Sequence, residues 1–320
     1  MIARDRIVIG ASAGGIIALK QLVANLPADL HAAIFISLHM VERGEMLLPQ
    51  ILEAAGPLRC SMAAEGMPIE DGHIYIAPPD FHLVLSPETI HLSHGPKEGL
   101  QRPSINVMFR SAAATFGDRV TGVLLTGMLD DGAAGLWEIL QCGGATVVQD
   151  PEEAAYRSMP ESAIRSLNVQ YILRLQEIAP LLMRLSMGER RPTKIDPPLL
   201  PAVPSLSGPP LTRQACPECG GVMRLEDRGT LMEYTCHVGH RLGLQSMICD
   251  KTDVVERSMW KVLSQSEELI ELLQNSQVDA DPAHRATLQA EIAARLHDMA
   301  TIRAVLERPG TVRRATSRPR

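Results

Sequence analysis

The sequence predicts an α/β fold, in which a doubly wound and mostly parallel sheet lies between two layers of helices (a three-layer αβα arrangement). One observation supports this prediction, and a second marks where the predicted domain ends. Short apolar runs alternate with stretches of helical period over residues 1–187, and alternation of this kind is typical of parallel sheets covered on both faces. Residues 188–212 then break the pattern with seven prolines between 192 and 210, which indicates an extended linker.

The strands are predicted from apolar runs of strand length, and the helices from apolar residues three or four positions apart. The first helix stops before Pro27, and Pro78-Pro79 marks a turn between two strands. We expect strands at 7–10, 32–38, 72–77, 82–85, 89–92, 120–126 and 145–149, the 89–92 strand antiparallel to its neighbour. We expect helices at 16–26, 45–55, 104–115, 132–141 and 176–187.

The C-terminal part divides into three further segments. Residues 213–249 hold a cysteine cluster and are expected to form a small zinc-ribbon-like module. Residues 250–307 have helical period with an apolar stripe on each half, so they predict a helical hairpin that divides near 279–282. The hairpin either buries its own stripes or offers a docking surface to a partner. Residues 308–320 contain five arginines and no acid and are expected to be a disordered tail.

Composition excludes several classes of protein. The net charge of −6 and an aromatic content of 3% argue against nucleic-acid binding, because they supply neither a basic surface nor stacking platforms. The longest clean apolar stretch, 32–38, is far shorter than the ~18 residues that a membrane-spanning helix needs, so no membrane insertion is expected. Six cysteines, four of them in one short region, fit a reduced metal site and a cytoplasmic protein.

A candidate nucleophile follows the first strand. Residues 10–14 match G-x-S-x-G between a predicted strand and a predicted helix, which is the context of a nucleophile elbow. The small residues on either side of Ser12 permit a sharp turn, and the helix N-terminus directs free N–H groups at the same place. An oxyanion beside Ser12 would be stabilised there by the N–H of Ala13. The alternatives are a dinucleotide-binding loop and a purely structural turn.

His39 and an aspartate are the candidate partners of Ser12. Adjacent parallel strands end at the same edge of a sheet, so His39, at the end of the second strand, is expected near Ser12. A carboxylate accepting from the His39 ring would orient the base. Spacing alone leaves Asp130, Asp131 and Asp150 open. The histidines of the hairpin region are weaker candidate bases: His73, His82, His91 and His94.

The cysteine cluster predicts a metal site. Cys216 and Cys219 form C-x2-C, and Cys236 and His240 form C-x3-H sixteen residues later. Two close pairs of this kind make a tetrahedral S/N site, and Zn²⁺ is its usual occupant. Since four protein ligands leave no open position, the site is expected to be structural. His237 is an alternative to His240 as the fourth ligand.

Five ordered motifs resemble the catalytic domain of the CheB family of chemotaxis protein-glutamate methylesterases, over about residues 4–186. They are IGASAGG (9–15), SLHM (37–40), YIAPPDFHL (75–83), RPSINVMFRSAA (102–113) and TGMLDDGAAG (126–135). The resemblance implies a Ser–His–Asp triad of Ser12, His39 and Asp131, with the N–H groups of Ala13 and Met128 as the oxyanion hole. Ala13 stands where many members have Thr, and Leu129 where Gly is common.

The implied reaction is hydrolysis of protein L-glutamate γ-methyl esters on chemoreceptor helices, with release of methanol, and deamidation of selected glutamines as a second activity. It needs no cofactor. Family members often carry a receiver domain before the catalytic domain; here the resemblance begins at residue 4, so we expect no receiver domain in this chain. The alternatives are a serine hydrolase acting on another protein ester or amide, and a non-catalytic signalling or binding module. The expected partners are the helices of methylated receptors or other signalling proteins.

Overall fold

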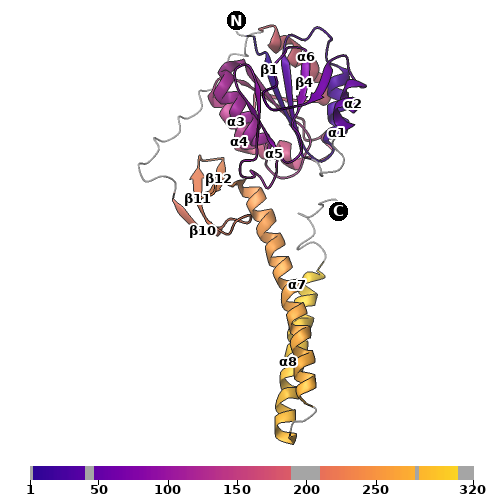
Figure 1. Cartoon of the computed structure of the whole chain (residues 1–320), viewed down its shortest axis with the longest axis vertical. Helices are drawn as coiled ribbons and strands as arrows, with labels where there is room; N and C mark the ends of the chain where they lie inside the picture. The colour runs from indigo at the N-terminus through magenta and orange to yellow at the C-terminus, as the bar shows by residue number, and fades with distance from the viewer. Residues whose placement is uncertain (1–2, 40–46, 189–209, 278–280, 309–320) are drawn as a thin grey trace. The chain divides into compact units, whose positions relative to one another are not determined.

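A computed structural model describes residues 3–39, 47–188, 210–277 and 281–308 (Figure 1). Most of the predicted linker at 188–212, the tail at 308–320 and the start of the helix predicted at 45–55 fall outside these ranges. The described residues form two compact units, residues 1–246 and residues 247–320, and each is described by itself.

The first unit is built on a sheet of seven strands, all of them parallel. Their order across the sheet is β3-β4-β2-β1-β7-β8-β9. The chain first builds the sheet on one side of β1 and later adds β7 on its other side, so the order reverses between β1 and β7. Ligand sites of open α/β sheets lie at the carboxyl ends of strands at such a point. The strands are β1 (Arg6–Ala11), β2 (Ala33–Leu38), β3 (Arg59–Met62), β4 (His73–Ile76), β7 (Val120–Leu124), β8 (Ala145–Gln149) and β9 (Tyr171–Leu173).

Helices cover both faces of this sheet, as predicted, because the central strands are apolar on both faces (Figure 1). In β1, Ile7 and Ile9 point into the core shared with α1, α2 and α6, while Val8 points into the core shared with α3, α4 and α5. The helices are α1 (Gly15–Ala24), α2 (Leu48–Glu53), α3 (Ile105–Phe116), α4 (Ala133–Gln141), α5 (Ser158–Ser166) and α6 (Leu175–Ser186).

Three of these elements were not predicted from the sequence: β3, α5 and β9. The strands β5 (His82–Leu85) and β6 (Ile90–Ser93) pair antiparallel, as predicted, but they form a separate two-stranded sheet. A short 3₁₀ turn, Gly117–Arg119, leads from α3 into β7.

The ribbon is a four-stranded antiparallel sheet in the same unit. Its strands are β10 (Leu211–Ala215), β11 (Val222–Asp227), β12 (Met232–Cys236) and β13 (Arg241–Gly243). The helix that follows begins at Leu244, six residues before the predicted helical segment 250–307.

Two helices, α7 (Leu244–Ser276) and α8 (Pro282–Leu306), pack against each other, and from residue 247 onward they form the second unit. Leu263 and Ile270 of α7 pack with Met299 of α8 in a small core. The side chain of Asp281 caps α8 by accepting from the N–H groups of Ala283 and His284, each at 2.9 Å. The helices therefore divide where the sequence predicts. Among the described residues, no helix is long and apolar enough to cross a membrane.

Candidate functional site

Ser12 lies in the turn between β1 and α1, at the carboxyl edge of the sheet. Ala11 and Leu38 are partners in the β1–β2 register, so Ser12 and His39 are the next residues on the two neighbouring strands. The N–H of Ser12 donates to the carbonyl of Thr126, beyond the end of β7, at 3.0 Å, and the N–H of His39 donates to the carbonyl of Ala11 at 3.2 Å. Backbone hydrogen bonds thus fix Ser12 between the ends of β2 and β7.

Two glycines allow this turn. Gly14 is the N-cap residue of α1 with a φ of 76°, a left-handed conformation that glycine adopts without strain. Gly127 faces Ser12 from the end of β7, and a Cβ added there would lie 2.9 Å from the Cβ of Ser12. A side chain at 127 would therefore force Ser12 or the side chain of Met159 to move.

His39 and Asp131 come together across the sheet edge. The Nε2 nitrogen of His39 lies 2.7 Å from Oδ2 of Asp131, and both side chains are nearly buried, with 9% and 2% of their surface exposed. Because a carboxylate only accepts, the Nε2 nitrogen carries the proton, which leaves the lone pair on Nδ1 as the base of the neutral ring. In the serine-protease triad the aspartate binds Nδ1 of the histidine instead, so the ring of His39 has the opposite orientation towards its carboxylate.

Asp131 also accepts the free N–H groups at the start of α3. The N–H groups of Ile105 and Asn106 donate to it at 2.7 and 3.0 Å, and the hydroxyl of Ser104 donates at 3.0 Å. Burial alone would raise the pKa of Asp131, but the hydrogen bond from His39 and those from Ile105 and Asn106 bring it below its ordinary value. The carboxylate therefore stays ionised at the positive end of a helix.

Sequence reasoning missed the residues that support Asp131 from α3. Ser104 is fully buried, and its N–H donates to Nδ1 of His82 at 3.2 Å. Burial lowers the pKa of His82, so this ring is neutral, and its Nε2 donates to the carbonyl of Pro96 at 3.0 Å. His82 is thus a support for Ser104. The amide oxygen of Asn106 accepts from the N–H groups of Gly132 and Gly135 at 3.0 and 2.7 Å. The only sequence signal for these roles is their place in or near the quoted motifs.

The other two candidate acids occupy different environments. Asp130 is buried, but its carboxylate accepts from the hydroxyl of Ser246 and from the N–H of Gln245 at 2.9 Å, both at the start of α7. Asp150 accepts from the N–H of Glu152 in its own turn at 2.9 Å. Of the three aspartates that spacing left open, Asp131 is the one hydrogen-bonded to His39.

The segment that carries the predicted oxyanion group Met128 is held by the start of α5. The carbonyl of Gly127 accepts from the N–H of Met159 at 3.1 Å, and the N–H of Leu129 donates to the hydroxyl of Ser158 at 3.2 Å. Leu129 has a φ of 67°, a strained value for a leucine and one typical of functional turns. The donor roles of Ala13 and Met128 remain predictions.

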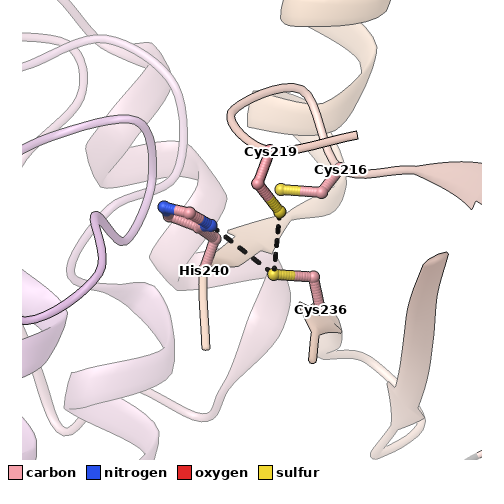
Figure 2. A group of neighbouring side chains, drawn as sticks. All are labelled: Cys216, Cys219, Cys236 and His240. Atoms are coloured by element: carbon pink, nitrogen blue, oxygen red, sulfur yellow. Dashed lines mark hydrogen bonds between the residues drawn. The ribbon is translucent and has the colours of Figure 1, made fainter. Parts of the chain in front are cut away.

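The four predicted metal ligands lie together in the ribbon, and Figure 2 shows their side chains converging. Their ligand atoms lie within 4.8 Å of one another. The Sγ atoms of Cys219 and Cys236 are 3.7 Å apart, and Nδ1 of His240 is 3.5 Å from Sγ of Cys236. Tetrahedral Zn²⁺ with Zn–S bonds of about 2.3 Å requires sulfurs about 3.8 Å apart, so the cluster fits this ion.

Two similar turns present these ligands. The N–H of Gly220 donates to the carbonyl of Cys216 at 2.8 Å, and the N–H of Gly239 donates to the carbonyl of Cys236 at 3.0 Å. Burial would raise the pKa of Cys236, but the ring of His240 and backbone N–H groups lower it to about 6. His237, the alternative ligand, is exposed, and its ring packs over Gly221.

This fold and site define a class. A parallel α/β sheet that presents a serine after β1 and a hydrogen-bonded histidine–aspartate pair from β2 and β7 has the architecture of a hydrolase, in the chain order Ser, His, Asp. The family model described as CheB methylesterase matches residues 7–182, more than half of the chain. The chain belongs to the CheB methylesterase family.

This chain is also similar to individual proteins with related descriptions. A Leptospira interrogans protein, described as "Putative protein-glutamate methylesterase/protein-glutamine glutaminase", is 41% identical over 185 residues, which are 58% of this chain and 96% of that protein. "Protein-glutamate methylesterase/protein-glutamine glutaminase 2" of Methanosarcina mazei is 37% identical over 190 residues, 57% of this chain and 52% of that one. This chain is also similar to the crystal structure of the Thermotoga maritima CheB methylesterase catalytic domain, with 30% sequence identity and a TM-score of 0.56. The match covers 57% of this chain and 98% of the Thermotoga chain.

Proposed function

We propose that this chain hydrolyses γ-methyl esters of protein glutamate residues, with Ser12 as nucleophile, His39 as base and Asp131 as the orienting carboxylate. The observation that carries the proposal is the hydrogen bond between His39 and Asp131, on the strand next to Ser12, in a chain of the CheB methylesterase family. Deamidation of protein glutamine is the second proposed activity, because the relatives' descriptions name both.

The proposed reaction has two halves. Oγ of Ser12 attacks the ester carbonyl carbon while Nδ1 of His39 takes the hydroxyl proton. The resulting oxyanion is stabilised by the N–H groups of Ala13 and Met128. As the C–O bond breaks, His39 returns the proton to the methoxide, and methanol leaves an acyl-enzyme on Ser12. Water activated by His39 then attacks the acyl carbon, and glutamate and free Ser12 are released.

Asp131 acts through His39. When the ring takes a proton it becomes a cation, and the ionised carboxylate 2.7 Å away stabilises that charge. The same carboxylate fixes the ring with Nδ1 as the nitrogen that lacks a proton. Since the N–H groups of Ile105 and Asn106 already neutralise part of its charge, Asp131 stays buried and ionised through the cycle.

The proposed substrate is a glutamate side chain on a helix of a methylated receptor or another signalling protein. The helices α7 and α8 are the proposed site for a further partner. Val255 and Trp260 of α7, both 53% exposed, and Leu296 of α8, 52% exposed, support an apolar contact there. None of the cysteines among the described residues forms a disulfide, which supports the cytoplasm as the proposed location.

We also propose that Cys216, Cys219, Cys236 and His240 bind one structural Zn²⁺. The distances among their sulfur and nitrogen atoms support tetrahedral binding. Four protein ligands complete the coordination, so the ion would cross-link the two turns of the ribbon. The proposed hydrolysis uses groups of the chain alone and no cofactor.

The experiment that tests the proposed reaction compares two serine variants. Ser12→Ala removes the proposed nucleophile, whereas Ser61→Ala removes another serine that is hydrogen-bonded to a histidine, His73, at 2.8 Å. We expect methanol release from a methylated receptor fragment to be lost in the first and kept in the second. Methanol release at the wild-type rate by Ser12→Ala would refute the proposal.

A further inference from the structure

The ribbon contacts two segments that lie next to Asp131, the proposed catalytic carboxylate. On one side lies Asp130, next to Asp131 in the sequence. On the other lies the segment 96–101, which leads into Ser104 and the start of α3. Each of these contacts is within the first compact unit.

Asp130 faces the junction between the ribbon and α7. Its carboxylate accepts from the hydroxyl of Ser246 and from the N–H of Gln245. Gly243, the last residue of β13, lies so close that a Cβ there would be 2.2 Å from the Asp130 carboxylate. The neighbour of the proposed catalytic aspartate is therefore enclosed by the ribbon end.

The segment 96–101 pairs with β13. The N–H of Gly99 donates to the carbonyl of Arg241 at 2.8 Å, and Glu98 and Arg241 form a parallel bridge. Gly99 in turn lies directly against Asp131, since a Cβ at that glycine would be 3.3 Å from the Cβ of Asp131. A displacement of β13 would thus be transmitted to Asp131 through one backbone segment.

A buried ion pair connects the same parts. Arg110 of α3 lies between Glu98 and Glu233 of β12, and the three side chains are 18%, 12% and 3% exposed. Burial would lower the pKa of Arg110, but the two carboxylates raise it above its ordinary value, so the guanidinium stays charged. A buried charge that loses one partner is strongly destabilised, so this arrangement favours the docked ribbon.

We propose that the docked ribbon is a positioning element of the active site: it holds Asp131 in place through Asp130 and the 96–101 segment, so that loss of the ribbon's metal ion or of its docking contacts slows the chemistry at Ser12. This inference rests on the proposed function, since it takes Ser12 and Asp131 as catalytic. It assigns the ribbon a role in the rate of hydrolysis, beyond a role in folding.

The fluorescence of Trp137 can report whether the ribbon is docked. Its two tryptophans are Trp137 and Trp260, and the guanidinium of Arg228 on the ribbon lies 4.5 Å from the centre of the Trp137 ring on α4. A Trp260→Phe background leaves Trp137 as the single emitter. Undocking removes Arg228 from the ring, so we expect emission from Trp137 to move to longer wavelength.

The test uses the full chain in that background. Glu233→Gln removes one partner of Arg110, and Glu218→Gln is the matched control at an exposed ribbon position. We expect Glu233→Gln to shift the Trp137 emission and to lower kcat roughly 2- to 30-fold with little change in KM, the range of long-distance coupling. Labelling of Ser12 by a serine-directed phosphonate slows by a similar factor, and bound metal, measured by atomic absorption, is unchanged.

Two further samples cover the case in which Glu233→Gln folds poorly. Ser246→Ala removes one hydroxyl from Asp130, and treatment of the background protein with a metal chelator removes the ion. Both are expected to shift emission and slow labelling. Undocking with an unchanged labelling rate would overturn the inference, and a faster rate would show that the ribbon inhibits.

The readouts separate this inference from the proposed function. If no variant releases methanol but Ser12 is labelled more slowly on undocking, the proposed substrate fails and the positioning role stands. If Ser12 is not labelled in the starting protein, the nucleophile is wrong, and the positioning role fails with it.

Discussion

Asp131 binds His39 through the Nε2 nitrogen, at 2.7 Å, while accepting the first N–H groups of α3 with the same carboxylate. The carboxylate is thus both a helix cap and a hydrogen-bond acceptor for the ring. Its two functions share one geometry, because rotating the carboxylate away from His39 would also break the hydrogen bonds to Ile105 and Asn106. The ring is held by the fold itself, and changes at Asp131 are expected to affect both catalysis and stability.

Replacing Ser12 by alanine is expected to lower kcat at least ~10³-fold, since the remaining binding and oxyanion groups retain only part of the rate. The measurement is methanol release under saturating substrate. A circular dichroism spectrum matching the wild type is the control for folding. A raised KM with kcat unchanged, measured by varying the substrate concentration, would show that Ser12 binds substrate without attacking it.

Asp131→Asn is expected to lower kcat about 10³- to 10⁴-fold, because the amide cannot stabilise the ring cation. Asp150→Asn removes the third candidate acid and is expected to keep wild-type activity, since Asp150 caps its own turn. Equal losses in the two variants would contradict the assignment of Asp131 as the orienting group.

The pH dependence of stability follows from the lowered pKa of Asp131. A carboxyl group whose folded pKa lies below its unfolded value of about 3.9 stabilises the protein above that pH. This stabilisation is lost as the pH falls through the folded pKa. Urea unfolding should therefore show wild type more stable than Asp131→Asn near neutral pH, with the difference shrinking below about pH 4. A difference that grows on acidification would contradict this prediction.

Ser104→Ala is expected to lower the free energy of unfolding by roughly 1.5–3 kcal/mol, the contribution of a hydrogen bond to a charged group, and to lower kcat. Ser111→Ala is the matched control on α3, because its hydroxyl donates to the carbonyl of Met108 and accepts from the N–H of Leu85, and neither group contacts Asp131. Ser111→Ala is expected to leave kcat unchanged. Chemical denaturation and initial-rate assays measure the two effects.

Removal of a metal ligand is expected to weaken zinc binding at least about 10-fold, since even residues that only orient ligands have effects of that size. His240→Ala and His237→Ala form a matched pair, measured by competition with a chromophoric chelator. We expect the first to lose affinity and the second to keep it. The opposite result would make His237 the fourth ligand.

The central strands could be predicted because their apolar runs are unbroken, and their alternation with helices predicted a parallel sheet covered on both faces, but not the order of its strands. The two missed strands give weak signals: β3 has one buried residue, Cys60, and β9 spans three residues of which none is fully buried. The helix α5 contains Pro160 and several polar residues, so its apolar period is faint. These elements form because neighbouring elements supply their partners, and such tertiary effects leave little trace in local sequence.

The candidate site could likewise be predicted from the sequence only in part. Ser12 and His39 are expected near each other because they follow two neighbouring strands. In the structure, Ala11 and Leu38 form the last pair of the β1–β2 register, and Ser12 and His39 come directly after them. Spacing could not distinguish Asp131 from Asp130, since neighbouring residues in a loop point in directions that only the loop conformation decides. The support from Ser104 depends on where the N-terminus of α3 lies, and this is set by packing over the sheet.

The position of β7 beside β1 has a consequence for newly made protein. Ser12 precedes Asp131 in the order of translation, and Asp131 lies in the loop that follows β7, after four other strands of the sheet have been made. Until β7 docks on β1, the loop after β7 cannot bring Asp131 to the ring of His39. A chain that ends before this strand would therefore hold the proposed nucleophile without the carboxylate that orients its proposed base.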